Sequence, residues 1–214
     1  MSIRIRQQCV VLFTTASILI ANPYAMAFSE TRYEAAIKLL QDKSDSAAEQ
    51  AASEFKDMLK AEPENPLLLA YAGASVSKLA TTTIFPWKKM SYAEDGLAML
   101  DKSLQIIHAT PSSAMHGSVP VELEVKLAAA NTFLSVPGFM NRAARGQKLL
   151  SDILEHKAFP ATALPFRGAV WLCAAHLALT QNRHEDAKRY LNQILQNHAP
   201  QSDAANRLLQ GLPS

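Results

Sequence analysis

The side chains most able to carry chemistry are six histidines, two cysteines and 19 acidic residues, and their spacing matches no catalytic or metal-binding motif. The chain contains no His-Glu-x-x-His motif and no closely spaced cysteine pair, which are typical of zinc sites. A Gly-x-Ser-x-Gly turn and a glycine-rich phosphate loop are also absent from the sequence. We therefore expect no enzyme activity, no metal and no cofactor, and an all-α hydrolase with a dispersed site is the least favoured alternative. The histidines are scattered: His108, His116, His156, His176, His184 and His198.

Acidic residues mostly occur among basic ones in segments with helical periodicity. Glu185 and Asp186, for example, are each followed three residues later by a basic residue, Lys188 or Arg189. Charges at this spacing share a helix face and pair weakly in solvent. We therefore expect these carboxylates to lie mostly on exposed helix faces.

A segment that mixes aromatic and cationic residues is the sharper candidate for a binding site. Residues 84–89 read Ile-Phe-Pro-Trp-Lys-Lys and place Phe85, Trp87, Lys88 and Lys89 on a predicted turn between two helices. Large aromatic side chains are common anchors at protein interfaces. The composition therefore predicts contact with a protein partner.

A second turn has a related composition. Residues 136–142 read Val-Pro-Gly-Phe-Met-Asn-Arg and supply Phe139 and Arg142 as further candidate binding residues. We expect the two turns to lie on the same edge of the molecule. The alternative is that Phe85, Trp87 and Phe139 fold back and fill widened gaps between helices.

The first 27 residues read as a secretory signal peptide. Arg4 and Arg6 precede an apolar run at about 10–21, and a small-residue site, Ala-Met-Ala, follows at 25–27. We expect cleavage after Ala27 and export to the periplasm or the extracellular space. An uncleaved anchor is the alternative, but the run of about a dozen residues is shorter than the roughly 20 needed to span a bilayer.

Net charge argues against nucleic acid as a partner. The predicted signal contains two of the 21 basic residues and none of the 19 acidic ones, so residues 28–214 are close to neutral. A strongly basic surface for nucleic acid or for an anionic membrane is therefore not expected, and neither is stable membrane insertion after signal cleavage. Cys173 is the one cysteine of the predicted mature chain, and its apolar neighbours predict a buried thiol.

Hydrophobic periodicity predicts an all-α protein. Apolar residues recur every three to four positions after Ser29, in runs separated by short Pro, Ser or Asn breaks, and no segment shows sustained alternation. We expect one elongated domain over 28–214. Its predicted helices are 30–43, 44–60, 66–80, 91–108, 121–134, 141–156, 165–180, 183–196 and 202–210.

The segment 51–73 carries the spacing of a known repeat. It reads Ala-x3-Phe-x7-Pro up to Pro63 and then Leu-x2-Ala-Gly up to Gly73, which resembles the junction between two tetratricopeptide repeats (TPR). The last hairpin, with Trp171 and Ala187, resembles the same family. The resemblance implies a degenerate TPR-like α-solenoid of about four helical hairpins and a C-terminal capping helix, and an ordinary helical bundle is the alternative.

Departures from the repeat spacing are concentrated in the second and third hairpins. Gly73 and Gly96 lie 23 residues apart, whereas the repeat places such residues about 12 apart. About eleven residues are therefore predicted to be inserted, around 84–89. The third hairpin is also stretched.

The resemblance implies a concave groove lined by the first helices of successive hairpins. Such a groove would be largely apolar here and would bind a protein or peptide partner, as a helix or an extended apolar segment. The Lys, Arg and Asn set that grips peptide carboxylates in part of the family is not evident. The function implied is an exported protein-interaction scaffold, and a structural or accessory subunit of an envelope or transport assembly is the alternative. The implied groove residues, which could instead pack inside the domain, are Ala70, Ala74, Ser77, Leu127, Asn131, Leu172 and His176.

Overall fold

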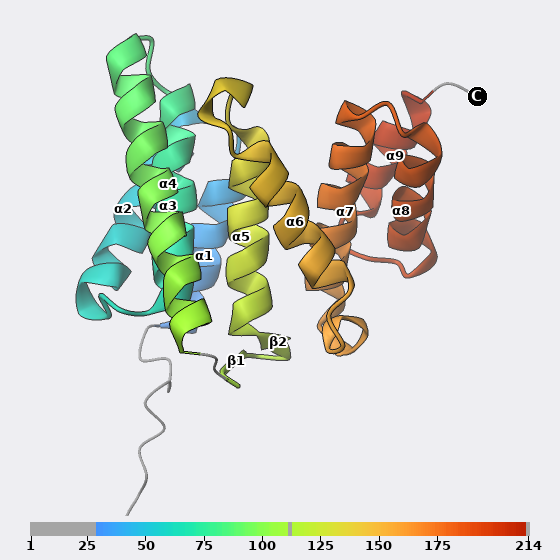
Figure 1. Ribbon diagram of the computed structural model, residues 1–214, viewed down its shortest axis with the longest axis horizontal. Helices are drawn as coiled ribbons and strands as arrows, with labels where there is room; N and C mark the ends of the chain where they lie inside the picture. The colour runs from blue at the N-terminus through green and yellow to red at the C-terminus, as the bar shows by residue number, and fades with distance from the viewer. Residues whose placement is uncertain (1–28, 111–112, 213–214) are drawn as a thin grey trace, which may run out of the picture.

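The computed structural model describes residues 29–110 and 113–212. Within these ranges nine α-helices pack in sequence order, which confirms the all-α prediction (Figure 1). Three 3-10 helices, η1 (Leu79–Thr81), η2 (Gly138–Met140) and η3 (Phe159–Ala161), and a hairpin of two short strands, β1 (Met115–His116) and β2 (Val119–Pro120), lie in the connections. The helices are α1 (Glu30–Gln41), α2 (Asp45–Ala61), α3 (Pro66–Lys78), α4 (Pro86–Ala109), α5 (Val121–Ser135), α6 (Ala143–Leu154), α7 (Leu164–Thr180), α8 (His184–Gln196) and α9 (Ser202–Gln210).

Helix α4 begins five residues before its predicted start, whereas the other eight begin within two residues of theirs. Proline is favoured in the first turn of a helix, because the N–H group that it lacks would have no partner there. Phe85, which precedes Pro86, keeps the extended backbone that a following proline favours, with φ −82° and ψ 117°. The predicted turn at 84–89 is therefore corrected, since residues 86–89 form the first turn of α4.

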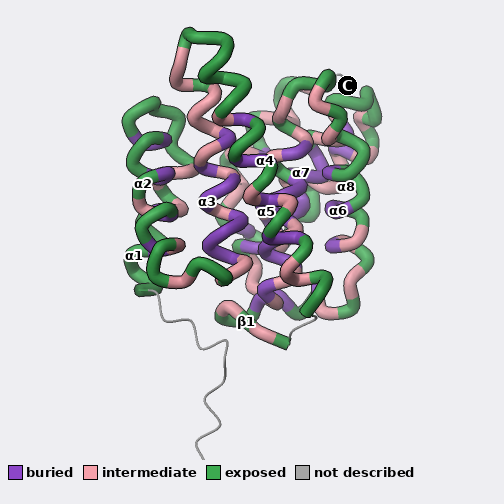
Figure 2. Tube along the Cα trace, turned by 60° about the vertical axis from the view of Figure 1, so that its left-hand side comes forward, coloured by how far each residue is buried: buried purple, intermediate pink, exposed green. Residues whose placement is uncertain are grey.

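The predicted insertion lengthens a helical hairpin and does not form a loop of its own. The extra residues form η1, the connection 82–85 and the first turns of α4, which is 24 residues long. Figures 1 and 2 show that this end of the α3 and α4 pair extends beyond the ends of the other helices. We call its exposed residues, 84–91, the hairpin tip.

Inner and outer helices differ in how much of their surface is buried. Nine of the 15 residues of α5 are buried, whereas α8 buries three of 13. Helix α5 packs against α3, α4, α6 and α7, which explains why its sequence is apolar on nearly every face. The segment 51–73 contributes to the same core, because Phe55 is fully buried and stacks on Tyr71 with ring centroids 5.5 Å apart.

Two glycines allow α3 and α4 to cross closely. A Cβ atom added at Gly96 would lie 2.2 Å from Ser77 Oγ and 2.4 Å from the carbonyl oxygen of Gly73. No side chain fits at that distance from another helix's backbone. The Gly73 and Gly96 pair in the sequence therefore marks this contact, and Ser103 Oγ strengthens the helix pair by donating to the carbonyl oxygen of Pro66 at 2.6 Å.

None of the described helices is both long and apolar enough to cross a lipid bilayer. The predicted signal peptide, residues 1–27, lies outside the described residues. The predicted burial of Cys173 is confirmed, because its side chain is 6% exposed.

Candidate functional site

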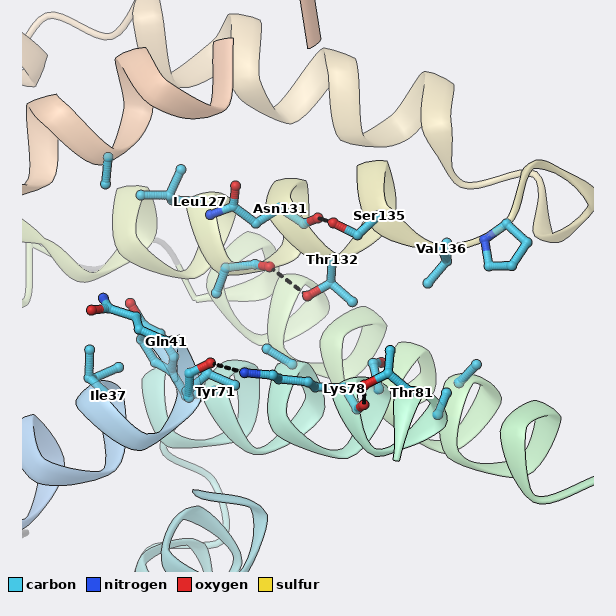
Figure 3. A pocket seen from close by; sticks show the side chains of 18 residues that line it. Ile37, Gln41, Tyr71, Lys78, Thr81, Leu127, Asn131, Thr132, Ser135 and Val136 are labelled. Carbon is cyan, nitrogen blue, oxygen red and sulfur yellow. Dashed lines mark hydrogen bonds between the residues drawn. The ribbon is translucent and has the colours of Figure 1, made fainter. Parts of the chain in front are cut away.

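A groove of about 500 Å³ lies between α1 and α3 on one side and α5 on the other (Figure 3). Ile37 of α1, Tyr71 and Ala74 of α3, and Leu127 and Ala128 of α5 contribute carbon-rich surface to its lining. Small alanines on two facing helices keep the groove open where larger side chains would fill it. The groove is therefore mainly apolar, with α1 and α3 forming one wall and α5 forming the other.

The implied groove residues divide into two groups. Ala74, Ser77, Leu127 and Asn131 line the groove. Ala70 lies one helical turn before Ala74 and is fully buried in the core; for this residue the alternative of packing inside the domain is correct.

Helix α7 contributes little to the groove. Its one lining residue is Ala169, and Leu172 and His176 lie elsewhere on the helix. Figure 1 shows the reason, since α5 and α6 separate α7 from α1 and α3. Leu172 and His176, which the resemblance implied as groove residues, are not among the residues that line this groove.

Lys78 is the cation that lines the groove, and its charge is already used within the fold. Its Nζ donates to the carbonyl oxygens of Leu40 and Asp42, at 2.5 Å each (Figure 3 shows the ammonium at the end of α1). The lysine thus pairs with unsatisfied carbonyl groups at the C-terminal end of α1. Burial lowers the pKa of Lys78, against the raising effect of Asp42. An ammonium held in this way is poorly placed to grip a peptide carboxylate.

Two side-chain amides lie on opposite walls of the groove. Gln41 belongs to α1 and Asn131 to α5, and within the described ranges neither amide group makes a hydrogen bond to another residue. The hydroxyl groups of Thr132 and Ser135 are satisfied, because Thr132 Oγ1 donates to the Ala128 carbonyl at 3.0 Å and Ser135 Oγ to the Asn131 carbonyl at 2.6 Å. The buried Ser77 Oγ also lines the groove and has no hydrogen-bond partner among the described residues. The two amides and this hydroxyl are consequently polar groups that a ligand can use.

The aromatic residues of the two predicted turns are exposed. Phe85 is 43% exposed, Trp87 66% and Phe139 67%, so the alternative that they fill gaps between helices is wrong. The Phe85 and Trp87 rings lie 4.9 Å apart, and Lys88 Nζ lies 5.4 Å from the Phe85 ring centroid. Lys89 is exposed in the same helical turn. The hairpin tip and the loop between α5 and α6 lie at the same end of the molecule (Figure 1).

Arg142, the candidate binding cation of the second turn, pairs with residues of the same fold. Its Nη1 atom lies 2.9 Å from Asp101 Oδ2, and its guanidinium lies 5.4 Å from the Phe133 ring centroid. Arg145 ion-pairs with the same Asp101 carboxylate. Asp101 belongs to α4, so these contacts fasten the start of α6 to α4.

A buried polar cluster at the opposite end was not predicted. Glu124 is 8% exposed, and its side chain accepts hydrogen bonds at Oε1 from Tyr33 Oη at 2.7 Å and Tyr71 Oη at 3.2 Å. His116 Nδ1 lies 2.7 Å from Glu124 Oε2, and its Nε2 lies 3.0 Å from Glu30 Oε1. We call these five residues the Glu124 cluster. The expectation of exposed carboxylates fails here because α5 is enclosed on nearly all sides.

The geometry of the Glu124 cluster favours a charged histidine. Hydrogen bonding to Glu124 is the main cause that raises the pKa of His116 to about 9, and Glu30 adds to it. Burial raises the pKa of Tyr33 and Tyr71 well above the ordinary value, so both remain neutral donors. With both ring nitrogens facing carboxylates, an imidazolium has no lone pair to accept a proton. This arrangement suits a fixed ion network better than a general base.

A signal for the cluster exists in the sequence. Glu124 stands in the run Val-Glu-Leu-Glu-Val, at the start of a helix that is otherwise apolar. Its hydrogen-bonding partners, however, are up to 91 residues away along the chain, beyond the reach of any local spacing rule. Among the described residues, no group of three or more His, Cys, Asp and Glu side chains is arranged to hold a metal ion.

Comparison of the chain with known protein families, curated proteins and solved structures found no match. A functional inference therefore has to come from the residues and their geometry.

Proposed function

We propose that the protein is an exported scaffold of the TPR-like type that binds an extended apolar segment of a partner protein in the groove between α1, α3 and α5. One observation carries the proposal. The groove has a largely apolar lining and an amide side chain without a hydrogen-bonding partner among the described residues on each wall, Gln41 and Asn131.

The order of the helices supports the solenoid part of the proposal. The pairs α1 and α2, α3 and α4, α5 and α6, and α7 and α8 each pack together, and α9 packs on α8. The first helices of the first three pairs line the groove. This is the position of the binding surface that the TPR resemblance implies, and α9 corresponds to a capping helix.

An extended ligand suits the groove better than a helical one. An extended segment presents backbone N–H and C=O groups that need partners, and the amides of Gln41 and Asn131 can each donate and accept. A helix satisfies its own backbone groups and would leave both amides without a partner. A volume of about 500 Å³ has room for a few apolar side chains, since small-ligand pockets measure about 300 to 1,000 Å³.

Binding of labelled synthetic peptides tests the proposal. Fluorescence anisotropy would compare a Val- and Thr-rich extended peptide, a Leu- and Ala-rich helical peptide and an acidic peptide. We expect the extended peptide to bind most tightly. Asn131→Ala should weaken that binding about three- to tenfold, because a net hydrogen bond contributes about 0.5 to 1.5 kcal/mol.

Two alanine positions provide the matched control. Ala74→Glu places a charge in the groove and should abolish binding, whereas Ala98→Glu places it on the exposed face of α4 and should leave binding unchanged. Circular dichroism would verify that both variants keep their helices. Equal binding by the two folded variants, or tighter binding of the helical peptide, would overturn the proposal.

A second function, that of a structural or accessory subunit of an envelope assembly, is favoured by the exposed apolar residues of the hairpin tip. Ile84 is 85% exposed and Trp87 66% exposed, which is unusual for side chains of this size in isolated soluble proteins. An obligate subunit should co-purify with one partner in a constant ratio. A scaffold should purify alone as a soluble monomer, which analytical ultracentrifugation would detect.

A further inference from the structure

We infer that the hairpin tip attaches the protein peripherally to a lipid surface that carries anionic headgroups. The inference is separate from peptide binding, because the tip lies at the end of the α3 and α4 pair and its exposed residues, 84–91, do not line the groove.

Apolar side chains dominate the tip. Ile84, Trp87 and Met90 are 85%, 66% and 38% exposed, and Phe85 is 43% exposed. All of residues 84–91 are exposed. Aromatic and aliphatic side chains grouped in this way gain free energy by entering the interfacial region of a bilayer, where tryptophan is enriched.

The charges of the tip complement an anionic surface. Lys88 and Lys89 follow Trp87 directly, and the sequence contains no acidic residue between Lys78 and Glu94. Lysine side chains lay their carbon stems along apolar surface while the ammonium group reaches the headgroups, and Lys88 already lies beside the Phe85 ring. Anionic lipids attract such local clusters even when the whole protein is close to neutral.

The shape of the tip favours lipid over a protein partner. Figures 1 and 2 show it extending past the other helices as a convex end. Protein partners bind aromatic anchors in preformed pockets, whereas a lipid surface deforms around a protruding group. The loop that contains Phe139, which is 67% exposed, lies at the same end (Figure 1) and offers a second apolar contact. The contact is peripheral, because no described helix can span a bilayer.

Vesicle co-sedimentation tests the inference with the predicted mature chain. The probes are vesicles of phosphatidylcholine alone and of equal parts phosphatidylcholine and phosphatidylglycerol. We expect binding to the mixed vesicles, weakening as salt is added, and little binding to phosphatidylcholine alone. Lys88→Glu combined with Lys89→Glu should weaken binding at least about tenfold.

Tryptophan fluorescence locates the contact. The chain has two tryptophans, of which Trp171 is 9% exposed and serves as an internal reference. Binding should shift Trp87 emission to shorter wavelength and allow brominated lipid to quench it. Trp87→Phe should keep most binding and lose that shift.

Substitutions in the hairpin tip and in β1, at the opposite end of the molecule, provide the control. Ile84→Ser combined with Trp87→Ser should abolish vesicle binding, whereas Met115→Ser, at a 49% exposed position in β1, should not change it. No binding to mixed vesicles, or equal binding by both variants, would overturn the inference. A third result would also overturn it: the wild type forms a dimer in solution and binds no vesicles, and the Ile84 and Trp87 double variant is a monomer. A second copy of the chain would then cover the tip.

Discussion

The two ends of helix α4 lie in contrasting surroundings. Its first turn belongs to the hairpin tip, where Ile84 and Trp87 are exposed to solvent. Its last residues lead to the β1 and β2 hairpin, where His116 lies between the carboxylates of Glu30 and Glu124. The second end contains more groups of the kind used in catalysis, yet those groups satisfy one another. The contrast shows that chemically capable side chains indicate a binding or reaction site only when the fold leaves them accessible.

Among the substitutions that compare the two ends, removing the central carboxylate of the Glu124 cluster should have the largest effect on the stability of the fold. Glu124→Ala removes the acceptor that His116 Nδ1 and two tyrosine hydroxyl groups share, and we expect a loss of about 3 to 5 kcal/mol in the free energy of unfolding. Urea unfolding followed by circular dichroism measures it. Glu122→Ala is the control on the same helix, since Glu122 pairs with Lys126 near the surface and its loss should cost less than about 1 kcal/mol. Equal costs would mean that the cluster adds no stability.

Forcing apart α3 and α4 tests how the tip is held. Gly96→Ala would place a Cβ atom against the backbone of α3, and we expect a loss of about 3 kcal/mol from overpacking. Gly138→Ala is the control, because nothing lies within 4 Å of the added atom, and its effect should stay within about 0.5 kcal/mol. Thermal and urea unfolding would compare the two. If Gly96→Ala had the same unfolding midpoint as the wild type, the contact between α3 and α4 would be able to adjust to the added methyl group at no cost.

Raising the pH should weaken the cluster end and leave the tip unchanged. The pKa of His116 is raised from 6.5 to about 9 in the folded protein, so its stabilising contribution is fully present below about pH 6.5 and is lost as the pH rises through about 9. We expect a loss of about 2 kcal/mol over this window, allowing for partial solvent screening. Urea unfolding at a series of pH values measures it. Subtracting the profile of His116→Gln removes the contributions of other groups, and a flat difference would contradict the assignment.

Removing the exposed tryptophan should have the smallest effect on folding. Trp87→Ser is expected to change the free energy of unfolding by no more than about 0.5 kcal/mol, because an exposed side chain has few contacts to lose. Trp171→Ala is the buried counterpart and should cost about 3 to 5 kcal/mol. Urea unfolding of both variants gives the comparison. A large loss for Trp87→Ser would show that the tip contributes to the core and is not an available surface.

Local sequence patterns predicted the helices well because the periodicity and the end signals of a helix depend on residues within a few turns of each other. Eight helix starts agree within two residues, and the exception depends on Pro86, which suits a helix start as well as a turn. The spacing of Gly73 and Gly96 predicted an insertion, but the close approach of the two glycines where α3 and α4 cross was not predicted. The extra residues between them lengthen the hairpin, because they continue the helical periodicity.

The candidate site was predicted less completely because it depends on how distant helices lie. Ala74 and Asn131 line the groove, but His176 does not, since the path of α7 past α5 cannot be deduced from helical periodicity. The contacts of Tyr33 with Glu124 and of Glu30 with His116 join segments that are 91 and 86 residues apart in the sequence. Only tertiary packing brings them together.

The burial of Cys173 has a consequence for redox chemistry. Removal from solvent raises the pKa of its thiol to about 12, so only about one molecule in 10⁵ carries the reactive thiolate near pH 7. In an oxidising compartment the folded chain would therefore resist intermolecular disulfide formation. Alkylation of Cys173 requires α7 to open from the helices packed against it, α5, α6 and α8, and its rate provides a measure of how often this part of the protein opens.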